Sequence, residues 1–94
     1  MVHLILSLDY EIFGNGSGDV RRDMVEPTTR LLTLCDAHGA KVSIMLEVGG
    51  YWAMKGAERT GSLRLGYSPS REMEQQVRDA VLRGHDVQLH LHPW

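Results

Sequence analysis

Apolar residues recur along this chain in two rhythms that alternate from one end to the other. Short runs of β-favouring apolar residues occupy 2–8, 41–48 and 86–92, and segments with helical spacing lie between them. Three- and four-residue spacing is typical of one face of a helix, whereas the short runs have the length of strands. The first run reads as a fully buried strand, because Ile5 adds an apolar residue on its second face. This order of elements predicts a parallel α/β sheet.

Proline and glycine mark where the helices are expected to begin and end. Pro27 and Pro69 suit first helical turns, the second of them behind the N-cap residue Ser68. Gly39 and Gly84 stand where a left-handed residue commonly ends a helix. The apolar stripes expected to face the core are Leu31, Leu34, Cys35 and His38 in the first helix and Met73, Val77, Ala80 and Val81 in the last. Residues 51–58 predict a further short helix.

Composition narrows the classes of protein that fit. With 94 residues, 43% of them hydrophobic and 23% charged, the chain is expected to form one small folded domain. A net charge of −2 gives no reason to expect nucleic acid or an anionic membrane surface as partner. The single cysteine, Cys35, is expected to be a packed core thiol. We find no membrane-spanning stretch and no signal peptide in the pattern, and therefore expect a cytoplasmic protein.

Polar residues of a particular kind stand at the ends of the expected strands. Asp9 and Glu11 follow the first strand, Glu47 ends the second, and His90 and His92 end the third. The carboxyl ends of parallel strands meet at one edge, so these side chains are expected to gather there. Carboxylate oxygen and imidazole nitrogen are ligands of a catalytic divalent metal such as zinc. A remaining carboxylate could act as a general base.

Plainer roles compete with this interpretation. A single Asp at a strand end is commonly a turn residue, and surface strands also carry His-x-His. His38 and His85 are expected to serve helix C-termini, and Trp52 is expected to pack in the core. The glycines within residues 14–19 are spaced G-x-G-x-G and do not run directly into a helix. They predict a connector or substrate-side loop and not a dinucleotide site.

Two stretches carry a resemblance to a known family. The segment SLDYE at residues 7–11 and the segment RGHDVQLHLHPW at residues 83–94 resemble the polysaccharide deacetylase (NodB homology) family, carbohydrate esterase family four, and most closely its cytoplasmic branch. The resemblance implies a distorted parallel (β/α) barrel, of which this chain would supply the first three βα-type units. It also implies removal of acetyl groups from N-acetylated sugars with a divalent metal, usually zinc.

The first motif of that family is T-F-D-D-G, in which the first Asp is the base and the second binds metal. Asp9 matches the base, and Tyr10 stands where the metal-binding Asp would be. The resemblance therefore assigns the metal role to a nearby carboxylate, either Glu11 or Asp19.

The family's second motif, H-[ST]-x-x-H, supplies two metal-binding histidines and often follows Gly-His-Glu. Residues 84–86, Gly-His-Asp, match this lead-in, and His90 matches the first ligand. The second ligand position falls on Trp94, so His92 is the substitute at a different spacing.

The combined expectation is a metal-dependent hydrolase that removes N-acyl groups from an amino sugar or polysaccharide. Asp9 would be the catalytic base, and Glu11, His90 and His92 would hold the metal. The chain shows no counterpart of the family's general acid, so we expect it to be inactive as the N-terminal part of a longer domain. Two alternatives stay open: another His-x-His hydrolase, either an amidohydrolase or a phosphoesterase, and a non-catalytic binding module. The sequence also leaves a homo-oligomer open.

Overall fold

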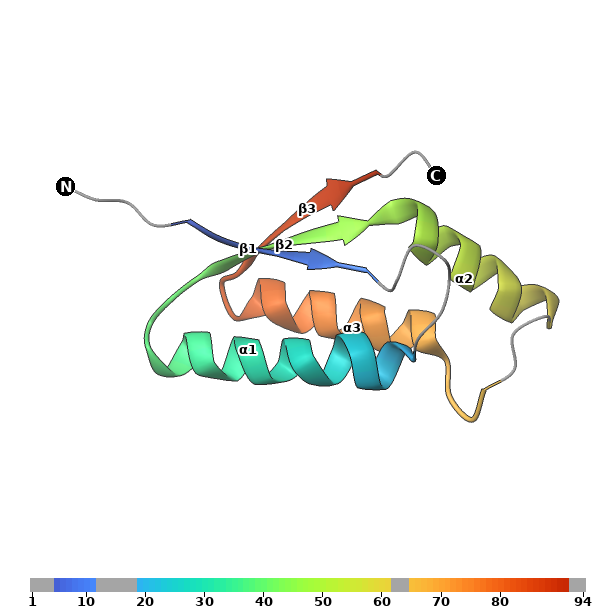
Figure 1. The fold of residues 1–94 in the computed structure, drawn as a ribbon, viewed down its shortest axis with the longest axis horizontal. Coiled ribbons are helices and arrows are strands. Elements are labelled where there is room, and N and C mark those ends of the chain that lie inside the picture. Colours follow the sequence, from blue (N-terminus) through green and yellow to red (C-terminus); the bar gives the residue numbers. More distant parts are fainter. Residues whose placement is uncertain (1–4, 12–18, 62–64, 92–94) are drawn as a thin grey trace.

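Three parallel strands form the centre of the computed structural model, which describes residues 5–11, 19–61 and 65–91 (Figure 1). The strands are β1 (Leu6–Tyr10), β2 (Val42–Glu47) and β3 (Asp86–His90), and they lie side by side in the order β1-β2-β3. Leu8 of β1 is level with Ile44 of β2, which in turn is level with Val87 of β3. This common register brings the carboxyl ends of the three strands to one edge of the sheet.

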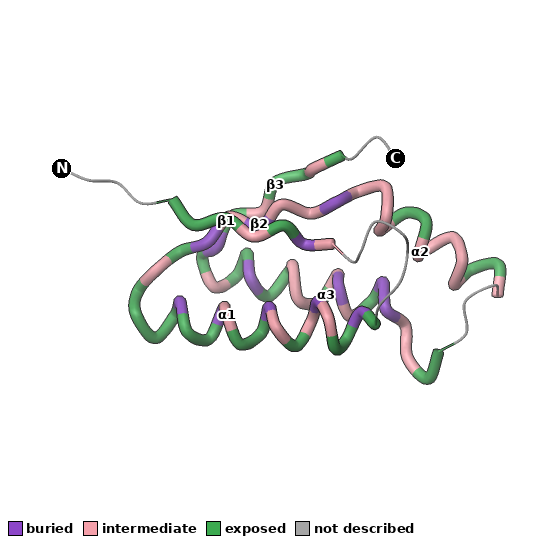
Figure 2. Tube along the Cα trace, in the orientation of Figure 1, coloured by how far each residue is buried: buried purple, intermediate pink, exposed green. Residues whose placement is uncertain are grey.

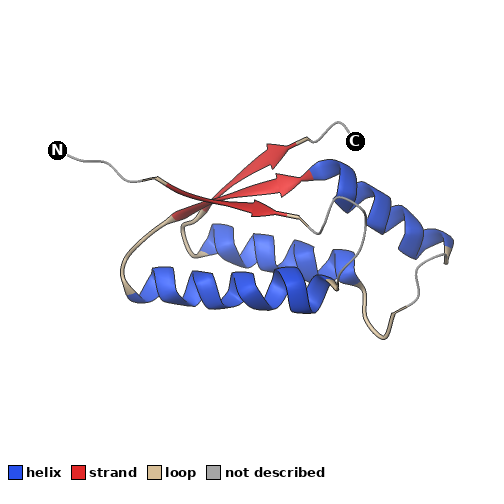
Figure 3. Ribbon diagram, viewed as in Figure 1, coloured by secondary structure: helices blue, strands red, loops and turns tan. Residues whose placement is uncertain are grey.

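Helices are placed on one face of this sheet and at its carboxyl edge (Figure 3). A π-helical turn, η1 (Arg21–Val25), leads into α1 (Glu26–Ala37), and α3 (Pro69–Leu82) lies beside α1 beneath the strands. The helix α2 (Val48–Thr60) starts directly after β2 and extends outward from the carboxyl edge. The expected α/β alternation is confirmed, and the short helix expected at 51–58 is longer at both ends.

The expectation of a segment of a distorted (β/α) barrel is wrong. β1 and β3 each pair only with β2, so the described strands form an open sheet with two edges. The inner face of such a barrel is filled by layers of bulky apolar side chains. Here the face turned away from α1 and α3, which we call the polar face, alternates with the core positions and carries Ser7, Asp9, Ser43, Met45, Asp86, Gln88 and His90.

The core lies between the sheet and the helices α1 and α3 (Figure 2). Tyr10, Val42 and Ile44 are buried from the sheet side, and Leu32 and Met73 meet them from the helices. Burial is therefore one-sided, and the expectation of a first strand buried on both faces is wrong. Within the described residues no second layer covers the polar face, which explains the alternation of polar and apolar residues on β3 and, apart from Met45, on β2.

The helix α1 buries a different stripe from the expected one. Thr28, Leu32 and Cys35 are buried, whereas Leu34 is 58% exposed. Both stripes have helical spacing and share Cys35, but the buried stripe is rotated about the helix axis toward Thr28 and Leu32 and away from Leu34. The polar Thr28 belongs to the buried stripe, so a search for apolar residues alone selects the wrong rotation. The expectation of Cys35 as a core thiol is confirmed.

The C-terminal ends of α1 and α3 and the start of α3 follow the expected rules, whereas Pro27 does not begin a helix, because the helical turn η1 precedes it. The Ser68 hydroxyl accepts a hydrogen bond from the Arg71 amide at 3.3 Å, and Pro69 occupies the first helical position. Gly39 and Gly84 adopt left-handed φ values of 67° and 91°. These two glycines turn the chain back toward the sheet immediately before β2 and β3.

A buried tyrosine joins the sheet to both helices beneath it. Tyr10 donates its phenolic proton to Gln76 Oε1 at 2.7 Å, and Gln76 Nε2 donates to the Val25 carbonyl at 2.8 Å and to Thr29 Oγ1 at 2.9 Å. Burial of the phenol, together with the negative charge of Glu72, raises the pKa of Tyr10 above its ordinary value. Tyr10 therefore stays protonated as a hydrogen-bond donor, and it fixes the orientation of β1 on the core.

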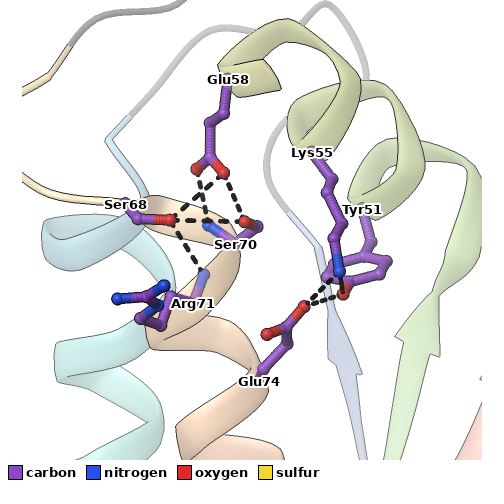
Figure 4. A network of polar contacts seen from close by, with 7 residues as sticks. All are labelled: Tyr51, Lys55, Glu58, Ser68, Ser70, Arg71 and Glu74. Carbon is purple, nitrogen blue, oxygen red and sulfur yellow. Dashed lines mark hydrogen bonds and ion pairs between the residues drawn. The ribbon is translucent and has the colours of Figure 1, made fainter.

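The helix α2 is attached to α3 mainly by polar contacts (Figure 4). None of the residues of α2, all of which are described, is fully buried. Tyr51 donates to Glu74, and Lys55 Nζ lies 2.9 Å from Glu74 Oε1. One turn later, Glu58 accepts hydrogen bonds from the amide and hydroxyl of Ser70 and from the hydroxyl of Ser68.

The hydrogen bonds to Glu58 change its ionisation. Burial opposes ionisation of this carboxyl group, but the bonds from the Ser70 amide, the Ser70 hydroxyl and the Ser68 hydroxyl outweigh it. The pKa of Glu58 is therefore held below its ordinary value of 4.5. The ionised form stabilises the attachment of α2 to the start of α3.

The carboxylate of Glu47 determines where α2 begins. Its Oε1 accepts from the Gly49 amide at 2.9 Å and its Oε2 accepts from the Gly50 amide, so both oxygens cap the helix. A Cβ atom on Gly50 would lie only 2.7 Å from Glu47 Oε2. The missing side chain of Gly50 therefore leaves room for the carboxylate to approach the helix terminus.

This cap predicts opposite effects for two glycine substitutions in the same helix. We expect Gly50→Ala to lower the free energy of unfolding by about 1 kcal/mol, because the new Cβ displaces the capping carboxylate. The control is Gly56→Ala, which meets nothing within 4 Å and should raise stability by about 0.5–1 kcal/mol. Urea denaturation measures both. A stabilisation of equal size in the two variants would contradict the capping role.

The lowered pKa of Glu58 predicts how stability responds to acid. A carboxyl group whose pKa is lower in the folded state stabilises the fold above its unfolded value, and that contribution is lost as pH falls through the folded value. We expect the free energy of unfolding to decrease between about pH 5 and pH 3, with a smaller decrease in Glu58→Gln. Urea denaturation across this pH series measures both proteins. Parallel pH profiles would show that Glu58 contributes nothing through its ionisation.

Candidate functional site

The carboxyl edge of the sheet brings together part of the expected constellation. Asp9 of β1 is level with Met45 and Gln88, and one step further along the same face Glu47 is level with His90. Asp9 and His90 therefore share the polar face, with β2 between them. Neighbouring strands are about 4.8 Å apart, so β1 and β3 are separated by about 10 Å. His90 also lies two residues further along β3 than Gln88, the residue level with Asp9, so a ligand would have to extend across β2 to contact both side chains.

The three described candidates differ in exposure. Asp9 is exposed on the polar face near the end of β1, whereas Glu11, directly beyond that strand, is half-buried. His90 is the last residue of β3 and is also half-buried. The fourth candidate, His92, lies outside the described residues, as do Trp94 and the glycine-rich loop over residues 12–18.

A pocket of about 220 Å³ opens where β1 faces η1 and the start of α1. Asp9, Glu11 and Asp23 contribute to its lining, together with apolar residues such as Leu8 and Met24. The Arg22 guanidinium, with a further hydrogen bond from the Asp19 amide, lowers the pKa of Asp23 to about 2. The pocket thus has one acidic rim and one apolar wall.

Glu47 has a structural role that the sequence analysis missed. It is only 3% exposed, and its carboxylate caps α2, as described above. Glu47 stands at the end of β2 as expected, but its carboxylate binds the backbone amides at the start of α2. The signal that could have identified it is the pair Gly49-Gly50, which follows the acid and allows its side chain to reach two backbone amides.

Asp19, the alternative to Glu11 as a metal-binding carboxylate, is engaged in loop contacts. Its Oδ1 accepts from the Tyr67 hydroxyl at 3.1 Å and from the Arg22 amide at 3.2 Å. The Arg22 amide and the Tyr67 hydroxyl lower the pKa of Asp19. The guanidinium of Arg21 stacks over the Tyr67 ring at 3.9 Å, so the start of η1 is tied to the segment before α3.

His85, the histidine of the Gly-His-Asp lead-in, links the sheet to the end of α1. Its ring is buried, and Nδ1 accepts a hydrogen bond from the Val42 amide at 3.2 Å. The other nitrogen must then carry the proton, and Nε2 lies 2.9 Å from Asp36 Oδ1. Arg83 also binds Asp36. Its guanidinium has the largest effect in lowering the pKa of the Asp36 carboxyl group, His85 has a smaller effect in the same direction, and burial opposes both. His85 is therefore a structural residue placed far from the carboxyl edge.

The metal expectation stays a prediction. Among the residues that the structure describes, no three His, Cys, Asp or Glu side chains form a group that could hold a metal ion. Glu11 directly follows β1 and His90 ends β3, and His92 would have to complete the set with them. The fit therefore depends on a position outside the described ranges.

Trp52 is not a core residue, contrary to expectation. Its side chain is 58% exposed, and it lies at the start of the second turn of α2, near the carboxyl edge. The apolar pattern of α2 did not reveal this exposure, because Met54, two residues later in the same helix, does pack against the core.

Comparison of the sequence with protein families, curated proteins and solved structures gives no match. The resemblance to the polysaccharide deacetylases therefore rests on the two quoted motifs alone. Among the helices of the described residues, none has the length and apolar character needed to cross a membrane.

The structural role of His85 predicts a clear contrast between two histidines. His85→Ala should lower the free energy of unfolding by about 1–3 kcal/mol, because it leaves the Val42 amide without its partner. His38→Ala is the control, since His38 is exposed at the end of α1, and its effect should stay within about 0.5 kcal/mol. Urea denaturation at neutral pH measures both. Equal stability of the two variants would refute the structural role.

Proposed function

We propose that this chain carries the hydrolytic edge of a metal-dependent enzyme that removes N-acyl groups from amino sugars. In this proposal Asp9 is the general base, and Glu11, His90 and His92 are the ligands of a divalent metal, zinc by ligand type. The substrate class comes from the motif resemblance, and the arrangement of the residues comes from the sheet.

One observation carries the proposal. The common parallel register places Asp9 and His90 on the same polar face, near the carboxyl edge, and Glu11 follows Asp9 by two residues. A lone strand-end Asp would be an ordinary turn residue. Its position on one face with an imidazole from β3, on the other side of β2, would allow one substrate to contact both residues.

Each of these residues has a definite task in hydrolysis. A divalent ion bound at this edge would supply Lewis-acid activation of water and of the amide carbonyl. Asp9, exposed on the polar face, is able to accept the proton of the attacking water on a carboxylate oxygen. Leu8 and Tyr10, on either side of Asp9, face the core, so the direction of the Asp9 side chain is set by the strand.

A non-catalytic carbohydrate-binding module is the second candidate. The observation that favours it is the role of Glu47, which removes one of the expected carboxylates from the edge. Such a module would use the same polar face and would not need a metal.

Zinc calorimetry tests the ligand set directly. We expect the protein to bind zinc, and we expect His90→Ala and Glu11→Gln each to weaken binding at least about tenfold, because each removes one of few ligands. His38→Ala should bind as the wild type does. Absence of zinc binding, or wild-type binding by His90→Ala, would overturn the proposed metal site.

Acetate release from oligomers of N-acetylglucosamine tests Asp9 as the base. The assay uses the zinc-loaded full-length protein, which has to include the general acid. Asp9→Asn should lower the rate by about 10²–10⁴-fold. Asp86→Asn is the matched control, because Asp86 lies on the same face at the opposite end of the sheet. An Asp9→Asn rate equal to that of the control would rule out Asp9 as base.

A further inference from the structure

Trp52 has a location that core packing does not explain. It begins the second turn of α2, a helix that starts directly after Glu47, and Glu47 is level with His90 at the carboxyl edge. Five residues of helix correspond to about 7.5 Å of rise. Trp52 therefore stands roughly one sugar ring beyond the end of β2. With 58% of its surface exposed, it is the only tryptophan in the described residues and presents a large aromatic surface to solvent.

The neighbouring side chain holds this part of α2 in place. Tyr51 is bound through its hydroxyl to Glu74, and Lys55 Nζ lies 3.3 Å from the same hydroxyl. The Tyr51 and Trp52 rings are 5.9 Å apart, with an angle of 58° between their planes. A tilted aromatic pair at this spacing is a favourable arrangement, so the Trp52 ring is supported on one side by a fixed neighbour.

We propose that Trp52 is a stacking platform for a pyranose ring of the carbohydrate bound at the polar face. A pyranose has an apolar face of C–H groups, which suits an exposed indole, and a rim of hydroxyls, which suits carboxylates and amides. The polar face supplies such partners in Asp9 and Gln88. This inference rests on the carbohydrate substrate of the proposed function and adds a binding residue outside the proposed catalytic set.

The rigid indole is well suited to this task. An aromatic side chain has only two rotatable torsions, so ordering it on binding costs little conformational entropy. The capping of α2 by Glu47 and the contacts of Tyr51 fix the backbone from which Trp52 projects. Binding would therefore draw on a preformed surface, which favours affinity.

Intrinsic fluorescence reports on this residue directly. In a Trp94→Phe background, Trp52 is the only emitting tryptophan of the chain. Titration with the tetramer of N-acetylglucosamine should produce a saturable change in its emission. By calorimetry, Trp52→Ala should weaken tetramer binding at least tenfold, and Trp52→Phe should weaken it less. Leu82→Ala is the control, because Leu82 is an exposed apolar residue, 82% accessible, at the end of α3.

The outcomes separate this inference from the proposed hydrolysis. An unchanged emission with the tetramer, or tetramer binding by Trp52→Ala that equals that of Leu82→Ala, would overturn the stacking role. An emission change that follows protein concentration without sugar would assign Trp52 to self-association and also overturn it. Retained sugar-dependent emission in a protein that releases no acetate would uphold stacking and reject hydrolysis alone. Circular dichroism of each variant confirms that it is folded.

Discussion

The parallel register of three strands, which the described helices cover on one face, is the constraint on which the rest of this structure depends. Because successive residues of a strand point to opposite faces, one-sided covering divides each strand into a core set and a polar set. Tyr10, Val42 and Ile44 belong to the core set, and Asp9 and Gln88 belong to the polar set. The same register that builds the core therefore aligns the polar residues near the carboxyl edge.

The connections at the ends of the sheet have separate physical origins. At the amino end, the His85 ring bridges the Val42 amide and Asp36, so β2, α1 and the start of β3 are held together by one buried side chain. At the carboxyl end, the Glu47 carboxylate caps α2 and determines where that helix leaves the sheet. Buried side chains thus hold both ends of the sheet, and the carboxyl edge in addition keeps exposed groups such as Asp9 and Trp52. That exposure is compatible with the ligand site that we propose at this edge.

Local chemistry allowed the elements to be predicted, but not how they pack. Ser68, Pro69, Gly39 and Gly84 have roles that depend on the backbone conformation of a single turn, and the structure confirms them. The prediction of the buried stripe of α1 was wrong, because the observed stripe contains Thr28. The burial of Thr28 depends on tertiary packing and not on polarity. The prediction of a barrel segment was wrong, because the alternation of strands and helices along a sequence does not reveal whether a sheet closes or what covers its second face.

The candidate site shows the same division. The strand ends of Asp9, Glu47 and His90 were predictable, since the carboxyl edge of a parallel sheet follows from strand order alone. The engagement of Glu47 and the exposure of Trp52 were not, because both depend on the direction in which α2 leaves the strand. A capping acid and a ligand-binding acid look alike in a sequence until the neighbouring helix is placed.

The most direct test of the account is to follow the five histidine rings by NMR during a zinc titration. If the carboxyl edge is the metal-binding edge, the His90 ring resonances shift with added zinc at stoichiometric concentration. The His85 ring, buried between the Val42 amide and Asp36, keeps its position. If the His90 ring resonances did not shift with zinc, and only those of other histidines did, the account would be contradicted.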